Sequence, residues 1–197
     1  MFNWFKYSLL KTNIILLSCE RYQKMTFRNR CIVAGSKGII NLSVPIAGGR
    51  VQRTPYKDVR ICNLEKWQLN HWRTITSCYN RSPYFEYYRD GLEPFFVKRC
   101  DFLFDHNLSI LYWLKQILGF PPGFVITDQL NGQSSNGEII EDIRNKWLPK
   151  NFQAERAGFV YPQVFEDRIG FQPNLSILDL LFNAGPETMN ILKQGLE

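Results

Sequence analysis

Four basic side chains lie close together in residues 21–30, near the start of the chain. They are Arg21, Lys24, Arg28 and Arg30, and Tyr22 stands among them. Arginine and lysine side chains at this density can neutralise a phosphate or a carboxylate through charge-assisted hydrogen bonds. The same pattern is also typical of a solvated basic surface beside a strand. The charge pattern therefore indicates an anionic ligand, and it leaves the plain surface as an open alternative.

His71 is the titratable residue whose neighbours in the sequence are most informative. It belongs to a stripe at spacings of three and four that predicts a helix over residues 64–79, formed by Leu64, Trp67, His71, Ile75 and Cys78. A histidine on the inner face of a helix is partly removed from water and can act as a general base near neutral pH. A core histidine held by one hydrogen bond would produce the same spacing. His106, beside Asp105 at the start of another predicted helix, is expected to be exposed or to cap that helix.

Asp179 is an acidic residue within the apolar run LSILDLLF. Burying an unpaired carboxylate is costly, so an inward-facing Asp179 needs an arginine, a histidine or backbone N–H groups as partners. Pairing with His71, or with an arginine of residues 21–30, would create a candidate site. A position on the one solvated face of the helix is the alternative.

The usual strong catalytic motifs are absent from the sequence. It contains no Walker loop, Rossmann fingerprint or serine elbow, and with two histidines it excludes a multi-histidine metal centre, so we expect no metal site and assign no cofactor. The five cysteines are odd in number and widely spaced, which argues against a disulfide framework and indicates a reducing, cytoplasmic environment. The net charge of +6 is spread along the chain without a motif that reads nucleic acid, and no apolar run reaches the roughly 20 residues of a membrane span. We therefore expect a small anionic partner, no nucleic acid and no membrane span.

The length of 197 residues, with 45% hydrophobic and 21% charged residues, is typical of one globular domain spanning residues 1–197. The patterns predict a single α/β domain with a mixed β-sheet and flanking helices. Strands are predicted at residues 13–18, 30–34, 39–46, 59–62, 124–127 and 159–165, with the second and third joined as a hairpin by a turn at 35–38. Helices are predicted at residues 2–10, 64–79, from 83 onward, and at 107–118, 138–147, 175–182 and 187–193, with a mobile loop at 128–137.

Four blocks of the sequence resemble the WbqC-like family. In chain order they are ERYQKMTFRNRCIVAG, NLSVPI, KWQLNHWRTITSCYNRSPYFEYY and YPQVFEDRIGFQPNLSILDLLFNAGPE, so the resemblance covers most of the chain. It places the basic stretch, the His71 helix and the Asp179 helix in one family-wide pattern. On this basis His71 and Asp179 are the expected catalytic residues, and the expected anion- and substrate-binding residues are Arg21, Tyr22, Lys24, Arg28, Arg30, Tyr79 and Asn174.

The resemblance also implies a pathway, because the family is associated with bacterial surface-polysaccharide and O-antigen gene clusters. The leading hypothesis is a cytoplasmic transferase acting on an activated sugar or aminosugar, with acyl or aminoacyl transfer as the reaction and His71 as a base oriented by Asp179. The rival is a non-catalytic sugar-nucleotide-binding or assembly protein of the same pathway. Family chains usually begin with a strand ahead of the segment equivalent to residues 3–5, so that strand is expected to be missing here, and an inactive truncated copy is a third interpretation. The oligomeric state is left unassigned.

Overall fold

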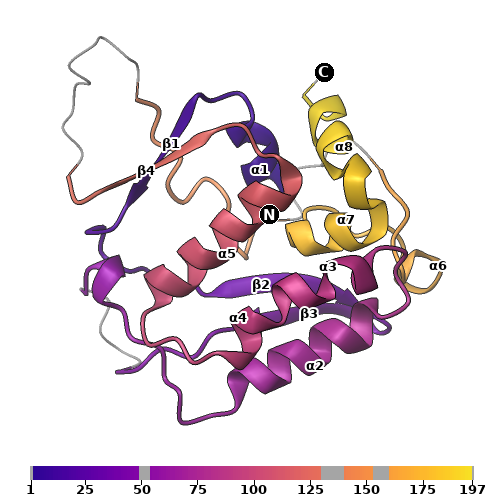
Figure 1. Cartoon of the computed structure of the whole chain (residues 1–197), viewed down its shortest axis with the longest axis horizontal. Helices are drawn as coiled ribbons and strands as arrows, with labels where there is room; N and C mark the ends of the chain where they lie inside the picture. The colour runs from indigo at the N-terminus through magenta and orange to yellow at the C-terminus, as the bar shows by residue number, and fades with distance from the viewer. Residues whose placement is uncertain (1, 49–53, 130–139, 153–159, 197) are drawn as a thin grey trace.

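The computed structural model describes residues 2–48, 54–129, 140–152 and 160–196. The chain begins with helix α1 (Phe2–Ser8) and strand β1 (Asn13–Leu17). β1 pairs in parallel with β4 (Gly123–Thr127), in a register that runs from Asn13 opposite Gly123 to Leu17 opposite Thr127. This two-stranded sheet lies apart from the second sheet (Figure 1). The predicted helix and strand at the start of the chain, and the strand before residue 128, are confirmed.

The second sheet is the predicted hairpin. Strand β2 (Arg30–Gly35) pairs antiparallel with β3 (Gly38–Ser43), and Gly38, with a φ of 133°, takes a backbone conformation that side chains disfavour. α2 (Trp67–Tyr79) lies against one side of the hairpin, and α7 (Ile177–Ala184) contacts β2 from the other side (Figure 1). The hairpin is therefore the layer between the two helices that carry His71 and Asp179.

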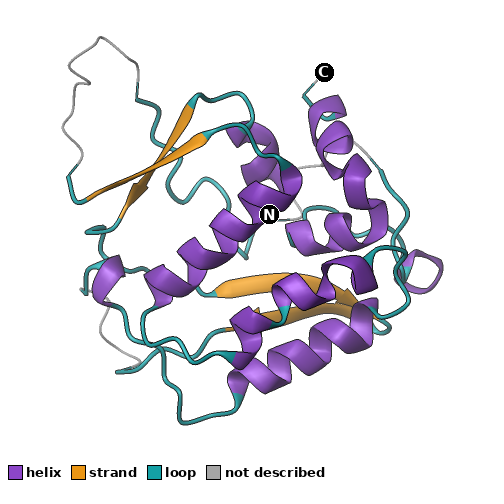
Figure 2. Cartoon of the chain, viewed as in Figure 1, coloured by secondary structure: helices purple, strands orange, loops and turns teal. Residues whose placement is uncertain are grey.

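The remaining helices complete the shell around this layer (Figure 2). They are η1 (Tyr56–Asp58), α3 (Phe85–Leu92), α4 (Pro94–Val97), α5 (Leu103–Leu118), α6 (Glu166–Ile169), η2 (Gly185–Glu187) and α8 (Thr188–Gln194). α5 ends at Leu118, as the predicted helix does, and Gly119 follows it with a φ of 59° that permits the left-handed cap. Ser176 caps the N-terminus of α7, and its hydroxyl accepts a hydrogen bond from the backbone N–H of Leu178 at 3.3 Å.

The main core forms where α2, α3 and α7 meet the hairpin. Tyr79, Phe85 and Phe182 are fully buried there, and the Phe182 ring lies 5.2 Å from the ring of Tyr79 and 5.1 Å from that of Phe85. A smaller second core gathers around Trp67 and Leu103, where α2 meets the start of α5. Aromatic packing thus stabilises the core between α2, α3, α7 and the hairpin.

The α/β class is confirmed, and the parallel and antiparallel pairings occupy two separate two-stranded sheets. Three predicted elements are wrong in the part of the chain that the structure describes. Residues 59–62 form isolated bridges to Ile46 and Phe102 and no strand, residues 140–147 form turns and no helix, and residues 160–165 contain no strand. Residues 138, 139 and 159 of these predictions, and 130–137 of the predicted loop, lie outside the described residues. Short apolar runs of this kind carry no periodicity that separates a strand from an extended loop.

Within the described ranges, every helix is too short or too polar to cross a lipid bilayer.

Candidate functional site

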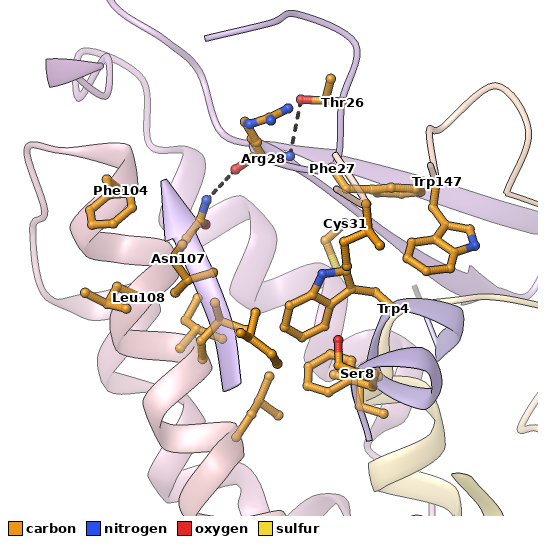
Figure 3. A pocket seen from close by; sticks show the side chains of 18 of the residues that line it. Trp4, Ser8, Thr26, Phe27, Arg28, Cys31, Phe104, Asn107, Leu108 and Trp147 are labelled. Carbon is orange, nitrogen blue, oxygen red and sulfur yellow. Dashed lines mark hydrogen bonds between the residues drawn. The ribbon is translucent and has the colours of Figure 1, made fainter. Parts of the chain in front are cut away.

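A cavity of about 770 Å³ opens between α1, β1, the start of β2, α5 and the segment at residues 140–147. Figure 3 shows Trp4, Phe27 and Trp147 grouped on one side of it, and Phe104 and Leu108 of α5 on the other. Most of the lining is apolar, whereas the charged groups are Lys11 and side chains of residues 20–30 and 140–145. The cavity therefore has a charged side and an apolar interior, which is the composition of a small-molecule site.

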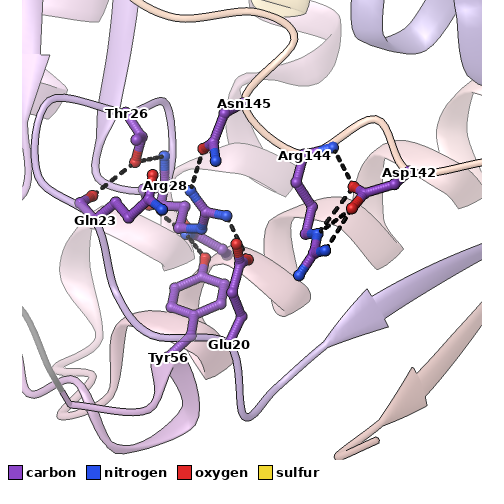
Figure 4. Close-up of polar contacts among 9 residues, drawn as sticks. Glu20, Gln23, Thr26, Arg28, Tyr56, Asp142, Arg144 and Asn145 are labelled. Atoms are coloured by element: carbon purple, nitrogen blue, oxygen red, sulfur yellow. Dashed lines mark hydrogen bonds and ion pairs between the residues drawn. The ribbon is translucent and has the colours of Figure 1, made fainter. Parts of the chain in front are cut away.

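Arg28 is the best-anchored cation on the charged side. Its guanidinium forms an ion pair with Glu20 and donates a hydrogen bond to the Asn145 side chain at 3.3 Å (Figure 4). Its backbone carbonyl accepts a hydrogen bond from Asn107 of α5. Because these contacts come from three separate segments, the loop, α5 and residues 140–147 together determine where this guanidinium lies.

Tyr56 and Asn107 form the polar contact beneath Arg28. Asn107 Nδ2 donates a hydrogen bond to the Tyr56 hydroxyl at 2.5 Å, and the Arg28 guanidinium lies 5.9 Å from the Tyr56 ring. Burial raises the pKa of Tyr56 to about 12, so its hydroxyl is neutral at physiological pH. The neutral phenol adds no charge beside Arg28, so within the described residues Glu20 is the ion-pair partner of this guanidinium.

Arg30 differs from Arg28 in having no acidic partner among the described residues. One guanidinium nitrogen lies 2.9 Å from the sulfur of Met25, and its Nε is buried without a hydrogen-bond partner in the described part of the chain. Asn29 Oδ1 and Ser8 Oγ, on residues that also line the cavity, share that state. Buried polar atoms in folded proteins are almost always satisfied, so these three atoms mark positions where a polar ligand group or water is needed.

The other members of the predicted basic site lie elsewhere. Arg21 and Lys24 are exposed and do not line the cavity, so the predicted cluster of four cations is divided into two pairs. Tyr22 is buried in the second core, where burial raises the pKa of its hydroxyl. The chain divides the cluster in this way because the Tyr22 ring turns inward, while its backbone pairs with the segment around Pro55.

His71 lines the cavity, and its neighbour is a second histidine. Its ring meets Trp67 edge-on at 5.2 Å, and His106 of α5 meets the same Trp67 ring at 5.4 Å. Burial lowers the pKa of each histidine to about 4, and the hydrogen bond from His71 to the Ser43 carbonyl opposes this only in part. Desolvation favours the neutral ring, so His71 could accept a proton only as a weak base at neutral pH, and its catalytic role stays a prediction. The prediction of an exposed or capping His106 is wrong, since α5 begins four residues earlier than predicted and turns this side chain inward.

Asp179 is fully buried and is held by a different set of partners. It accepts hydrogen bonds from the Tyr79 hydroxyl at 2.7 Å, the Tyr161 hydroxyl at 2.5 Å and the Gln163 amide at 3.2 Å. Tyr79 in turn accepts a hydrogen bond from the backbone N–H of Ala34 in β2 at 3.2 Å. Burial raises the pKa of Asp179, and these hydrogen bonds lower it in part. The network joins α2, β2 and α7 beneath the cavity.

His71 and Asp179 are therefore not partners, contrary to the expected base and orienting acid. Asp179 binds Tyr79, which lies two turns further along α2 than His71, about 12 Å along the helix axis. Asp179 and Tyr79 also do not line the cavity. The carboxylate is directed to two tyrosines because α7 crosses the hairpin at the end of α2, away from the Trp67 end.

Asn174 is buried and holds the chain rather than lining the cavity. Its side-chain amide donates a hydrogen bond to the Phe152 carbonyl at 2.8 Å, and its φ of 56° is the left-handed conformation that asparagine tolerates. It lies just ahead of Ser176, whose backbone N–H donates to the Ile32 carbonyl at 2.8 Å. Of the nine residues predicted for the site, the structure thus brings Arg28, Arg30 and His71 to one cavity.

Sequence reasoning missed the side chains that hold Arg28 and Asp179 in place. Glu20 and Asn107 gave no signal, since a carboxylate in a loop and an asparagine at a predicted helix start have many structural uses. Tyr161 and Gln163 lie within a block that resembles the family, and this was the one signal that pointed to them. Within the described ranges, no three His, Cys, Asp or Glu side chains are grouped as metal ligands.

Comparison with known proteins places the chain in a family. The profile of the WbqC-like protein family matches residues 2–148 and 148–191. The chain is 22% identical to the uncharacterized protein Rv1507c of Mycobacterium tuberculosis, over 91% of this chain and 87% of that protein. No solved structure gives a significant match. Because the family profile covers nearly the whole sequence, this chain belongs to the WbqC-like protein family.

Proposed function

We propose that this protein is a cytoplasmic transferase of bacterial surface-polysaccharide biosynthesis that moves an acyl or aminoacyl group onto an activated aminosugar. The observation that carries the proposal is the position of Arg28 and Arg30 on the wall of a largely apolar cavity. Guanidinium groups bind phosphates and carboxylates, and activated sugars and activated acyl donors commonly carry phosphate groups. Membership of the WbqC-like family supports the choice of pathway.

In the proposed reaction, the amine nitrogen of the sugar attacks the carbonyl carbon of the donor. The bond from that carbon to the leaving group breaks, and the nitrogen loses a proton. His71 is the proposed proton acceptor because it lines the cavity, is neutral, and uses one ring nitrogen to donate to Ser43, which leaves the other to accept. A base with a pKa of about 4 is weak at neutral pH, so the contribution expected of it is near the lower limit for general bases, roughly 10²-fold.

The direct test is incubation of the purified protein with acyl-coenzyme A donors and UDP-linked aminosugars. Mass spectrometry detects the N-acylated sugar nucleotide, and release of the coenzyme A thiol gives the rate. The proposal expects product formation that weakens in the Arg28→Ala variant. A folded protein that forms no amide with any donor in the panel would contradict the transferase assignment.

A second candidate function, a non-catalytic protein that binds a sugar nucleotide or assembles the pathway, is favoured by a separate observation. Asp179 is bound by Tyr79 and Tyr161, so this carboxylate does not orient His71. In this interpretation His71 is a packing residue between Trp67 and Phe96, and Arg28 holds the ligand without chemistry. Binding of a UDP-linked aminosugar without turnover, detected by calorimetry, would support this second function.

A further inference from the structure

The charged and apolar parts of the cavity come from different elements. The charged side chains of the lining are Lys11, Glu20, Arg28, Arg30, Glu141, Asp142 and Arg144, and all but Lys11 belong to the two loop segments at residues 20–30 and 140–145. Six of the seven form ion pairs with one another, and Arg30 has no acidic partner among the described residues. The opposite wall is built from buried or half-buried apolar side chains on four secondary-structure elements, namely Ile14 of β1, Ile75 of α2, Leu108, Leu111 and Leu114 of α5, and Leu178 of α7. A ligand that fits both parts must carry an anionic group at one end and an apolar body at the other.

The two titratable rings in the interior do not change this division. His71 and His106 lie between the rings of Trp67 and Phe96, and burial lowers the pKa of both to about 4. Both rings are therefore uncharged at neutral pH, so they add ring nitrogens but no net charge to an interior whose other walls are largely apolar. The unpartnered atoms Asn29 Oδ1 and Arg30 Nε lie instead on the residue that precedes β2 and on its first residue, next to Arg28. Ser8 Oγ, the third such atom, lies on α1. Two of the three unpartnered polar atoms thus lie beside the guanidinium groups of Arg28 and Arg30.

Burial in such an interior weakens the binding of a hydroxyl group and strengthens the binding of a hydrocarbon chain. A sugar carries hydroxyls on both faces of its ring, and each hydroxyl that loses water without gaining a partner opposes binding. Each buried methylene favours binding by about fourfold in affinity. The apolar wall therefore selects a hydrocarbon body over a sugar.

We infer that the cavity takes the unbranched hydrocarbon chain of an acyl group in its interior, with the anionic end of the ligand bound by Arg28 and Arg30. This inference rests on the proposed acyl transfer and deepens it by naming the donor, a fatty acyl donor. A polyprenyl phosphate has the same general chemistry, an anion on a hydrocarbon, but its branched chain is wider than the linear acyl chain. The binding experiment therefore compares linear with branched hydrocarbon chains.

The experiment measures dissociation constants for hexanoate, octanoate and decanoate below their micelle concentrations, by calorimetry on the full chain. The expected affinity rises about fourfold for each added methylene, because each one is removed from water. Decan-1-ol, which has the same chain without the charge, should bind roughly tenfold more weakly than decanoate. Geranyl phosphate, which has a branched chain, is compared with decyl phosphate, which has a linear one. Tighter binding of geranyl phosphate would overturn the inference of a linear acyl chain in favour of an isoprenoid.

Two variants test where the hydrocarbon chain and the carboxylate of the ligand bind, and a third is the matched control. Leu108→Trp fills space on the α5 wall and should weaken decanoate binding more than hexanoate binding, whereas Gln116→Trp, on the exposed side of the same helix, should change neither. Arg30→Gln should weaken all three acids by the same factor, roughly tenfold, and leave the chain-length slope intact. Circular dichroism of each variant verifies that it is folded.

The outcomes distinguish this inference from the function on which it rests. Affinity that does not change with chain length, together with Arg28-dependent binding of UDP-linked aminosugars, overturns the acyl-chain inference and leaves the proposed transferase standing. A clear chain-length slope without amide formation supports the acyl site and contradicts the transferase. No binding of any fatty acid by the folded wild-type protein overturns the acyl-chain inference.

Discussion

The Tyr79 hydroxyl donates a hydrogen bond to Asp179 Oδ1 at 2.7 Å, across a separation of 100 residues in the sequence. The same hydroxyl accepts a hydrogen bond from the backbone N–H of Ala34, so one oxygen joins α2, β2 and α7. Both side chains are fully buried, and neither lines the cavity. The acid that the sequence singled out therefore stabilises the frame beneath the site, and acts on the cavity only through the position of α7.

Removing the Tyr79 hydroxyl should destabilise the protein strongly. In Tyr79→Phe, Asp179 loses one donor and the Ala34 N–H loses its acceptor, so we expect the free energy of unfolding to fall by about 1–3 kcal/mol. Urea unfolding followed by circular dichroism measures this loss. Tyr87→Phe is the control, because the Tyr87 side chain is 79% exposed and its hydroxyl loss should cost little. Equal stability of the two variants would show that the buried network contributes nothing.

The two buried histidines should make the protein less stable in acid. Their pKa values are about 4 in the folded state and about 6.5 when unfolded, so the unfolded chain binds more protons between these values. The stabilisation from keeping both rings neutral is fully present above pH 6.5 and is lost as the pH falls towards 4. The free energy of unfolding should therefore rise from pH 4 to pH 6.5.

The measurement for this prediction is urea unfolding at intervals between pH 4 and pH 7. Asp179 acts in the opposite direction: its raised pKa means that its contribution to stability is lost as the pH rises through the folded value. His106→Gln removes one of the two histidine contributions without touching Asp179, so its pH dependence should be shallower than that of the wild type. An unchanged slope would contradict the lowered pKa of His106.

Under the transferase proposal, His71→Gln should separate activity from folding. We expect kcat/KM to fall roughly 10²-fold, because the substituted amide cannot take up the proton. The wild-type acid limb of the kcat/KM profile should lie near pH 4 rather than near pH 6.5, because the free enzyme carries the lowered pKa of His71. A pH profile from 4 to 8 measures both effects. Loss of stability in His71→Gln with unchanged kcat/KM would instead identify His71 as a packing residue.

Arg28 and Lys24 belong to the same basic stretch but should differ in their effect on ligand binding. Arg28 lines the cavity beside Glu20 and Asn107, whereas Lys24 is exposed outside it. Arg28→Ala should weaken binding of a UDP-linked aminosugar or decanoate by roughly tenfold or more, and Lys24→Ala should change it by less than about twofold. Calorimetry at two salt concentrations measures both variants. Similar losses in the two would indicate a diffuse surface charge effect without a defined site.

Individual helices and turns could be predicted from the sequence because their residue patterns extend over only a few neighbouring positions. The stripe through His71 and Ile75 predicted α2, and the glycines at residues 35 and 38 predicted the hairpin turn. The family resemblance likewise came from contiguous blocks of residues, and the family profile confirms it. These features depend on neighbours within a few residues, so the chain specifies them without knowledge of how its elements pack.

The partners of individual side chains were decided only by the tertiary structure. Periodicity put Asp179 on an apolar helix, but packing of α7 across the hairpin gave it Tyr79 and Tyr161 instead of His71. Charge counting grouped Arg21 with Arg28, but the inward turn of Tyr22 left only the later arginines at the cavity. The sequence by itself determined the fold class, the family and the helices that carry the candidate residues. Only the packing of distant segments decided which of them meet, because burial and hydrogen-bond partners depend on distances in space and not on spacing along the chain.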